Sequence, residues 1–291
     1  MDDVAQNRSA WLALLDFHVE AGVDYALEDE PQNRLAAPEP QQPENNRIPD
    51  DFVSPAPIQR SVAAFEPQQQ ASNARPVSAS AAIPPDEVAL IAREQARHAN
   101  SLDELRQLLS QFDGCALRTS AKNLVFSDGN PASRIMFVGE APGGEEDRIG
   151  KPFVGRSGQL LDRMLKAIGL DRDSVYIANI VPWRPPGNRT PTPQETAICK
   201  PFIERQIELV DPDFLVCLGG PSTQNLLNVR DGILRTRGRW FPYSAGDKTI
   251  QALATLHPAY LLRQPLQKRL AWRDFQALRQ AYDRPKDTPA S

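Results

Sequence analysis

Residues 134–143 read RIMFVGEAPG, an apolar run that ends in a glycine, an acid and a turn. Four consecutive large apolar residues predict a strand buried on both faces, because a half-exposed strand alternates apolar with polar residues. Three similar runs follow it: VYIANI at residues 175–180, FLVCLG at residues 214–219 and IQALATLH at residues 250–257. These four runs are the predicted strands of one sheet.

Helical patterns separate the predicted strands. Residues 158–169 carry leucine and methionine at spacings of three and four, and a Thr-Pro start at Thr192 predicts a helix to about Val210. We expect further helices at residues 87–109, 221–227 and 266–282. Strands that alternate with helices pair in parallel and carry helices on both faces, so the sequence predicts an α/β fold. Ligands of such sheets bind outside the carboxyl ends of the strands.

The first 85 residues have a different pattern. Residues 9–27 form an amphipathic helical pattern that is too short to be stable without a partner surface, either the rest of the chain or another protein. Residues 29–85 hold 11 prolines in 57 positions and few large apolar groups, a composition typical of a disordered tether. The expected organisation is a helical segment, a tether, a folded domain and a tail, at residues 1–28, 29–85, 86–284 and 285–291.

The composition limits the cellular locations in which we expect the protein to act. Its 291 residues are 41% apolar, yet none of its apolar runs reaches the roughly 18 residues of a membrane span. The amino terminus lacks the order of a secretory signal, and three cysteines over this length do not form a disulfide framework. We expect a monomer in the reducing cytoplasm of a bacterium, near the nucleoid and not on a membrane.

The net charge of −4 hides a strong segregation of charge. Residues 1–85 hold 13 acidic and 5 basic residues, whereas residues 228–291 hold 12 basic and 5 acidic residues. A basic carboxyl-terminal segment is compatible with a nucleic-acid partner, although the whole chain is acidic.

The glycine-rich loop at residues 139–155 contains the first candidate site residues. Glu140 is the first charged residue after a buried strand, where a carboxylate can stabilise positive charge or orient a water molecule. Phe153, in the same loop, either belongs to the core or stacks on a flat ring. The loop matches neither of the common glycine-rich phosphate-binding motifs, so a nucleotide site is not favoured.

Two more candidates end predicted strands. Asn179 is either a turn residue or an amide that reads the edge of a base, since an amide offers both a donor and an acceptor. His257 is the only histidine at a predicted strand end, where it can donate to a developing anion; the chain offers no second histidine for a metal site there.

Residues that follow His257 suggest contacts with DNA. Leu261, Leu262 and Arg263 form a predicted turn with an apolar wedge beside a cation, the kind of feature that inserts between base pairs. Arg189, with its neighbours at residues 184–188, and the RTRGR run at residues 235–239 are either phosphate contacts or ordinary solvated surface.

Five motifs occur in order between about Cys115 and Tyr282: GEAPG, EDRIGKPFVGRSGQLL, YIANIVPWRPPGNR, PTPQE and HPAYLL. Together they resemble the family 4 uracil-DNA glycosylases, which usually carry an iron–sulfur cluster. The resemblance implies a three-layer αβα sandwich around a parallel four-stranded sheet. It also implies hydrolysis of the N-glycosidic bond of a flipped-out uracil in DNA, which leaves an abasic site.

The resemblance assigns roles to the candidates. Glu140 matches the acid after the first strand, and His257 matches the histidine that hydrogen-bonds the departing base. The substrate-binding positions of the family match Ala141 and Pro142 beside the pocket, Phe153 as the ring that stacks on uracil, and Asn179 as the amide that reads its edge. No lysine stands in the motifs as a nucleophile, so we expect a monofunctional glycosylase rather than a lyase.

The cysteines depart from the family pattern. The family holds its cluster with a C-x-x-C pair before the first strand, a third cysteine after the second strand and a fourth in the next helix. The corresponding residues here are Phe112, Cys115, Trp183 and Cys199, while Cys217 falls in a strand as a core thiol. Two thiolates are too few for a four-iron cluster, so we predict no cofactor and expect Phe112 and Trp183 to fill its volume with apolar bulk.

Two alternative functions remain open at this point. The same fold can act on another deaminated base, such as hypoxanthine or xanthine, because Phe153 and Asn179 would also suit a purine. A non-catalytic protein that binds DNA damage is the second alternative, although the joint presence of Glu140, Asn179 and His257 counts against it. The partner of residues 9–27 is expected to be a repair or replication protein.

Overall fold

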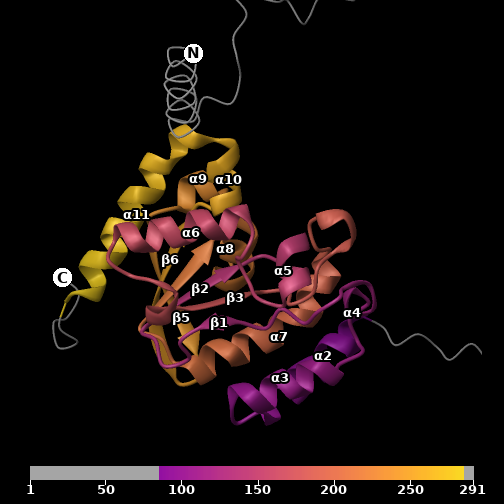
Figure 1. Ribbon diagram of the computed structural model, residues 1–291. Coiled ribbons are helices and arrows are strands. Elements are labelled where there is room, and N and C mark those ends of the chain that lie inside the picture. Colours follow the sequence, from indigo (N-terminus) through magenta and orange to yellow (C-terminus); the bar gives the residue numbers. More distant parts are fainter. Residues whose placement is uncertain (1–84, 285–291) are drawn as a thin grey trace, which may run out of the picture. The chain divides into compact units, whose positions relative to one another are not determined.

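The structure is a computed structural model that describes residues 85–284 (Figure 1). Four strands correspond to the four predicted runs and pair in parallel in the order β3-β2-β4-β6. Their bounds are Ile135–Gly139 for β2, Tyr176–Asn179 for β3, Phe214–Leu218 for β4 and Lys248–Thr255 for β6. The predictions for residues 1–28, for the tether and for the tail lie outside the described residues, apart from the boundary residue Pro85.

Two short strands that the sequence did not reveal extend the sheet to six strands. They are β1, Asp128–Gly129, which pairs antiparallel with β3, and β5, Trp240–Ala245, which pairs antiparallel with β6. Two residues are too few to give a pattern, and β5 contains Pro242. Because proline cannot donate to a ladder, its presence argued against a strand, and it is accommodated here at the sheet edge.

Alternate strand residues face two separate cores. Met136 and Val138 of β2 belong to a core covered by α2 (Pro85–His98), α3 (Leu102–Gln111), α7 (Pro193–Val210) and α8 (Gly220–Leu227). Ile135 and Phe137 belong to the other core, covered by α6 (Arg156–Ala167) and α11 (Lys268–Tyr282). Figure 1 shows these two groups of helices on opposite faces of the sheet. The expected three-layer αβα sandwich is confirmed.

Some helix boundaries differ from the prediction. The single helix expected at residues 87–109 is two helices, α2 and α3, because Ser101 begins a new helix and accepts a hydrogen bond from the Glu104 N–H at 3.2 Å. The predicted turn after His257 is a helix, α10 (Pro258–Arg263). The prediction that α7 begins after Thr192 is confirmed, with Thr192 and Glu195 forming a capping box.

The remaining elements are short helices and 3-10 turns in the connections between the longer elements. They are α4 (Leu117–Ser120), α5 (Gly144–Ile149), α9 (Ile233–Thr236), and the 3-10 turns η1 (Arg172–Ser174), η2 (Pro186–Asn188) and η3 (Pro265–Gln267). None of the helices in residues 85–284 is long and apolar enough to cross a bilayer.

Candidate active site

The end of β2 is a glycine because two side chains from other segments converge on it. Gly139 pairs in register with Asn179 at the end of β3. A Cβ atom added to Gly139 would lie 2.5 Å from Asn179 Oδ1 and 2.6 Å from Phe153 Cζ. Asn179 and Phe153 are therefore neighbours at the carboxyl edge of the sheet, where the sequence predicted the site.

Glu140 is the residue after Gly139, and the pairing between β2 and β3 continues past it. The N–H of Val181 donates to the carbonyl oxygen of Glu140 at 3.0 Å, which fixes the backbone of this acid. Burial raises the pKa of the Glu140 carboxyl above its ordinary value. Within residues 85–284, its Oε1 atom and Asn179 Oδ1 are the two buried side-chain polar atoms that have no hydrogen-bond partner. Unpaired buried acceptors are costly, so such atoms commonly mark a place where a ligand binds.

Phe153 has an unusual backbone. Its φ of 53° lies in the left-handed region, which is strained for a residue with a side chain, and its ring is almost completely buried. The ring lies against His257, with centroids 5.5 Å apart and an angle of 31° between the planes. The side chains of Asn179, Phe153 and His257 thus follow one another around the edge of the sheet.

His257 follows β6 and caps the start of α10. The backbone N–H of Ala259 donates to its Nδ1 atom at 3.1 Å, so in the neutral ring the proton is on Nε2. Burial, and then the charge of Arg263, lower the pKa of His257 to about 4. Gly219 makes this position possible, because a Cβ atom there would lie 2.9 Å from the Cβ of His257. At neutral pH the imidazole is uncharged and offers an N–H.

A cavity of about 230 Å³ opens beside Glu140. Its polar lining comes from Thr190 and Thr196, on either side of the start of α7, and from Gln224 and Asn225 of α8. Sequence reasoning missed these four residues because none has a chemistry that stands out from ordinary surface polarity. The cavity gives this edge of the sheet space for a polar group next to the partly buried Glu140.

Ala141 and Pro142 form the wall that leads from Glu140 into α5. Ala141 is half-buried and Pro142 is buried. Glu146, in the same loop, caps the start of α5, because its Oε2 atom accepts from the Gly143 N–H at 3.1 Å.

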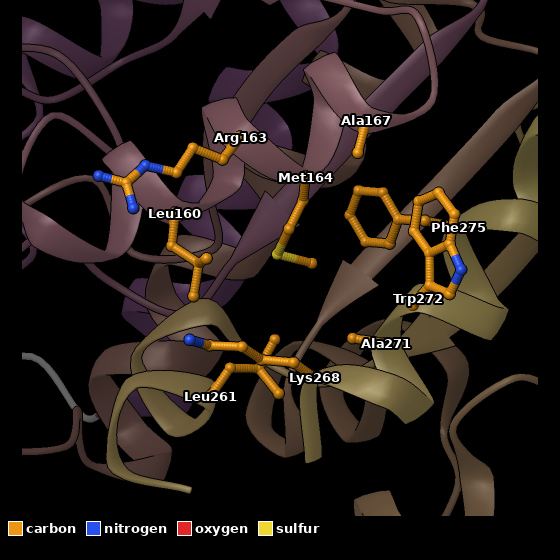
Figure 2. A pocket seen from close by; sticks show the side chains of 9 residues that line it. All are labelled: Leu160, Arg163, Met164, Ala167, Leu261, Lys268, Ala271, Trp272 and Phe275. Atoms are coloured by element: carbon orange, nitrogen blue, oxygen red, sulfur yellow. The ribbon is translucent and has the colours of Figure 1, made fainter. Parts of the chain in front are cut away.

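The proposed wedge after His257 needs a correction. Leu261 is only 1% exposed and points into an apolar groove of about 190 Å³ that α10 forms with α6 and α11 (Figure 2). Because α10 is a helix, the two leucines point in different directions, and Leu262 remains partly exposed beside the exposed Arg263. Leu261 packs within the protein, so only Leu262 and Arg263 are left for a wedge.

Two of the candidate phosphate-binding arginines are engaged within the protein. Both terminal nitrogens of Arg189 donate to the carboxylate of Glu195, at 2.8 and 2.6 Å. Arg237, in the RTRGR run, forms a buried ion pair with Asp274, which also accepts from Thr255 Oγ1 at 2.7 Å. Arg237 therefore supports the fold and is not available to a phosphate, whereas Arg189 is exposed and would have to share its donors with Glu195.

The cysteine positions do not fit an iron–sulfur cluster. Cys115 and Cys199 are buried with their sulfur atoms 3.9 Å apart, and the hydrogen bond between them, together with burial, raises the pKa of the Cys199 thiol well above its usual range. Phe112 and Trp183 are buried in the same core, where the ring of Phe112 meets the edge of Phe202 with centroids 5.1 Å apart. Across residues 85–284, no three His, Cys, Asp or Glu side chains are grouped so that they could hold a metal ion.

These features define a class of protein. An αβα sandwich with an acid, an amide, an aromatic ring and a neutral imidazole at the carboxyl edge of its sheet is suited to enclose a flat ring with polar edges and to act on a bond beside it.

Comparison with known proteins gives the family. The profile of the Uracil DNA glycosylase superfamily matches residues 126–276. This chain belongs to that superfamily. A type-4 uracil-DNA glycosylase of Thermotoga maritima is 43% identical over 166 residues, which cover 55% of this chain and 85% of that protein.

Two archaeal relatives have the same description. The type-4 uracil-DNA glycosylase of Archaeoglobus fulgidus is 40% identical over 169 residues, 57% of this chain and 85% of its own length. That of Sulfurisphaera tokodaii is 38% identical over 192 residues, 64% of this chain and 87% of its own length. The resemblance that the five motifs indicated is thereby confirmed.

Proposed function

We propose that this chain is a DNA repair glycosylase that hydrolyses the N-glycosidic bond between uracil and deoxyribose and leaves an abasic site. The observation that carries the proposal is the state of His257, a neutral imidazole with its proton on Nε2, placed against Phe153. Membership of the superfamily and relatives named as type-4 uracil-DNA glycosylases support the same reaction.

His257 serves the departing base. When the glycosidic bond breaks, the base leaves with the bonding electrons and its negative charge spreads onto the carbonyl oxygens. An N–H aimed at one of these oxygens stabilises the charge as it develops. A neutral donor suits this task because it makes the hydrogen bond without needing a proton from solution near pH 7.

Phe153 and Asn179 hold the base. A buried aromatic ring offers a flat apolar surface for stacking, and the unpaired Oδ1 of Asn179 is an acceptor for an N–H on the base edge. Ala141 and Pro142 supply the backbone wall on the side of Glu140. Filling this site would satisfy an atom that is otherwise buried without a partner.

Glu140 serves the sugar. Glycosidic cleavage passes through a sugar with oxocarbenium character, and a nearby carboxylate stabilises that positive charge or orients the water that attacks C1′. The water oxygen bonds to C1′ and loses a proton, and the base accepts a proton after it has left. No described lysine is needed as a nucleophile, so the expected product is an intact abasic strand.

Leu262 and Arg263 are the candidates for contact with duplex DNA. They are the last two residues of α10, the helix that His257 caps, so a partly exposed leucine and an exposed cation lie close to the base-binding site. An apolar side chain inserted into the base stack would compensate for the base that is flipped out. Arg189 is a further candidate for a phosphate contact.

The proposal also covers the oligomeric state, the location and the part of the chain that precedes residue 85. We infer that the protein is a monomer, that it works in the bacterial cytoplasm at the nucleoid, and that residues 9–27 bind a repair or replication protein. A variant lacking residues 1–84 should therefore excise uracil from a short oligonucleotide at the full rate. A loss of excision in that variant would show that the segment is part of the enzyme.

The test of the proposed reaction is excision from a single-stranded oligonucleotide with one deoxyuridine, detected as alkali-labile cleavage. We expect cleavage by the full chain and its loss in E140A and H257A variants. Oligonucleotides that contain hypoxanthine or xanthine are tested in the same assay. Cleavage of these alone would show that the substrate is another deaminated base. Binding without cleavage of any of them would favour a protein that only recognises damage.

A further inference from the structure

Glu146 is a buried acid whose partners are backbone amides. It lies in the first turn of α5 and is 7% exposed. Its Oε2 atom accepts from the Gly143 N–H at 3.1 Å, while its Oε1 atom accepts from the N–H groups of Val154 and Gly155 at 3.0 and 2.8 Å. Hydrogen bonds to an ionised acceptor are stronger than those between neutral groups. The carboxylate therefore connects two separate stretches of chain.

These stretches carry different parts of the proposed site. Gly143 ends the segment that begins with Glu140, whereas Val154 and Gly155 directly follow Phe153. The two glycines leave room for these contacts, because a Cβ atom would lie 2.9 Å from Oε2 at Gly143 and 3.2 Å from Oε1 at Gly155. One carboxylate thus sets the separation between the acid and the aromatic ring.

Arg172 also restrains the backbone at Phe153. Arg172 donates to the carbonyl oxygens of Pro152, at 3.2 Å, and of Phe153. Gly158 leaves the space for that second carbonyl, since a Cβ atom there would lie 1.7 Å from it. The strained φ of Phe153 persists only if its surroundings enforce it, and the hydrogen bonds that Glu146 and Arg172 make to the backbone of residues 152–155 provide that enforcement.

We propose that Glu146 is a positioning residue for base excision, which holds Phe153 and the segment of Glu140 at the separation that encloses the base. The inference rests on the proposed function for its meaning in catalysis. Its structural part, a carboxylate that restrains two loops, does not depend on the reaction.

Replacing Glu146 by glutamine tests the restraint with little change in volume. The amide NH₂ group is a donor, so it faces a backbone N–H that also donates, and one of the two loops loses its anchor. Glu145→Gln is the matched control. Glu145 is the preceding residue of the same helix, is exposed, and pairs with Arg148 at 2.8 Å instead of with the loops.

The activity experiment measures kcat and KM for the single-stranded deoxyuridine substrate in the full chain. We expect E146Q to lower kcat/KM by roughly tenfold to a hundredfold, the scale of a misplacement near 1 Å, and E145Q to leave it within about twofold. In an F153A background, E146Q should cost much less, because the ring it positions is gone. A merely structural role would instead reduce both backgrounds equally.

Hydrogen exchange measured on peptides covering residues 139–155 tests the restraint without using activity. E146Q should speed exchange in both loops, and E145Q should not. Unchanged exchange, or a kcat/KM of E146Q equal to that of wild type, would overturn the inference even if uracil is excised. Faster exchange in a chain that excises no uracil would keep the restraint and overturn the proposed function alone.

Discussion

Two buried regions of this domain differ in whether their polar atoms have hydrogen-bond partners. At the carboxyl edge of the sheet, oxygens of Glu140 and Asn179 are buried without a partner. In the core between the sheet and α2, α3 and α7, the thiol of Cys199 donates a hydrogen bond to that of Cys115, and Phe112 and Trp183 belong to the same core. The edge keeps unsatisfied groups for a ligand, whereas the core replaces potential ligands of a cluster by apolar packing. Within residues 85–284, the buried polar atoms without a partner therefore lie at the carboxyl edge of the sheet and not in this core.

Removing an aromatic residue from the core should have the largest effect, and it should be on stability alone. Trp183 is 2% exposed, so W183A should lower the free energy of unfolding by about 3–5 kcal/mol. Trp272, 43% exposed at the groove in Figure 2, is the matched control, and W272A should cost below about 1 kcal/mol. Urea unfolding measures both. If W183A is folded at low temperature but has lost uracil excision, the hypothesis that this core affects stability alone is wrong.

Removing the acid at the edge should affect the rate and its pH dependence. E140Q should lower kcat by about a hundredfold, because it removes the carboxylate that stabilises the sugar cation. In wild type the rate should fall as pH falls through the raised pKa of Glu140, since the protonated acid carries no charge. His257 has a pKa of about 4, so it becomes protonated only at a lower pH than Glu140 does. E140Q should therefore lose the acid limb of the pH profile, and an acid limb that persists in E140Q would assign it to another group.

Leu262→Ala should lower the rate of excision from duplex DNA more than the rate of excision from a single strand. We expect excision from duplex DNA to fall about tenfold and excision from a single strand to change little, because only the duplex needs a side chain to fill the vacated stack. Leu90→Ala on α2, 62% exposed, is a control that should affect neither substrate. Equal losses on both substrates would remove Leu262 from the duplex contact.

The smallest effect should come from the thiols. Protein purified without oxygen should show no absorbance band near 400 nm and no stoichiometric iron, because two cysteines cannot hold a four-iron cluster. C115A should leave the spectrum unchanged and cost about 1 kcal/mol, the value of one lost hydrogen bond. An iron-dependent band that C115A abolishes would show that the core does bind a cluster.

The two regions also differ in how far the sequence could predict them. The four parallel strands follow from short apolar runs, and parallel pairing brings Asn179 and His257 to one edge. The left-handed backbone of Phe153 could not be predicted from the sequence, because it depends on hydrogen bonds that Glu146 and Arg172 make in the folded chain. The direction of the Leu261 side chain could not be predicted either, because it depends on whether residues 258–263 form a turn or a helix. The neutral state of His257 depends on burial, which appears only when the chain is folded.

The two outermost strands of the sheet affect how copies of the protein can associate. An exposed strand edge offers free backbone N–H and C=O groups to a neighbouring molecule, and long flat edges promote aggregation. Here one edge is β1, only two residues long, and the other is β5, where Pro242 removes a donor. The parallel strands in between, rich in β-branched and aromatic residues, have both sides paired. The domain therefore offers little template for intermolecular sheet growth, and we expect it to tolerate high concentration without forming fibres.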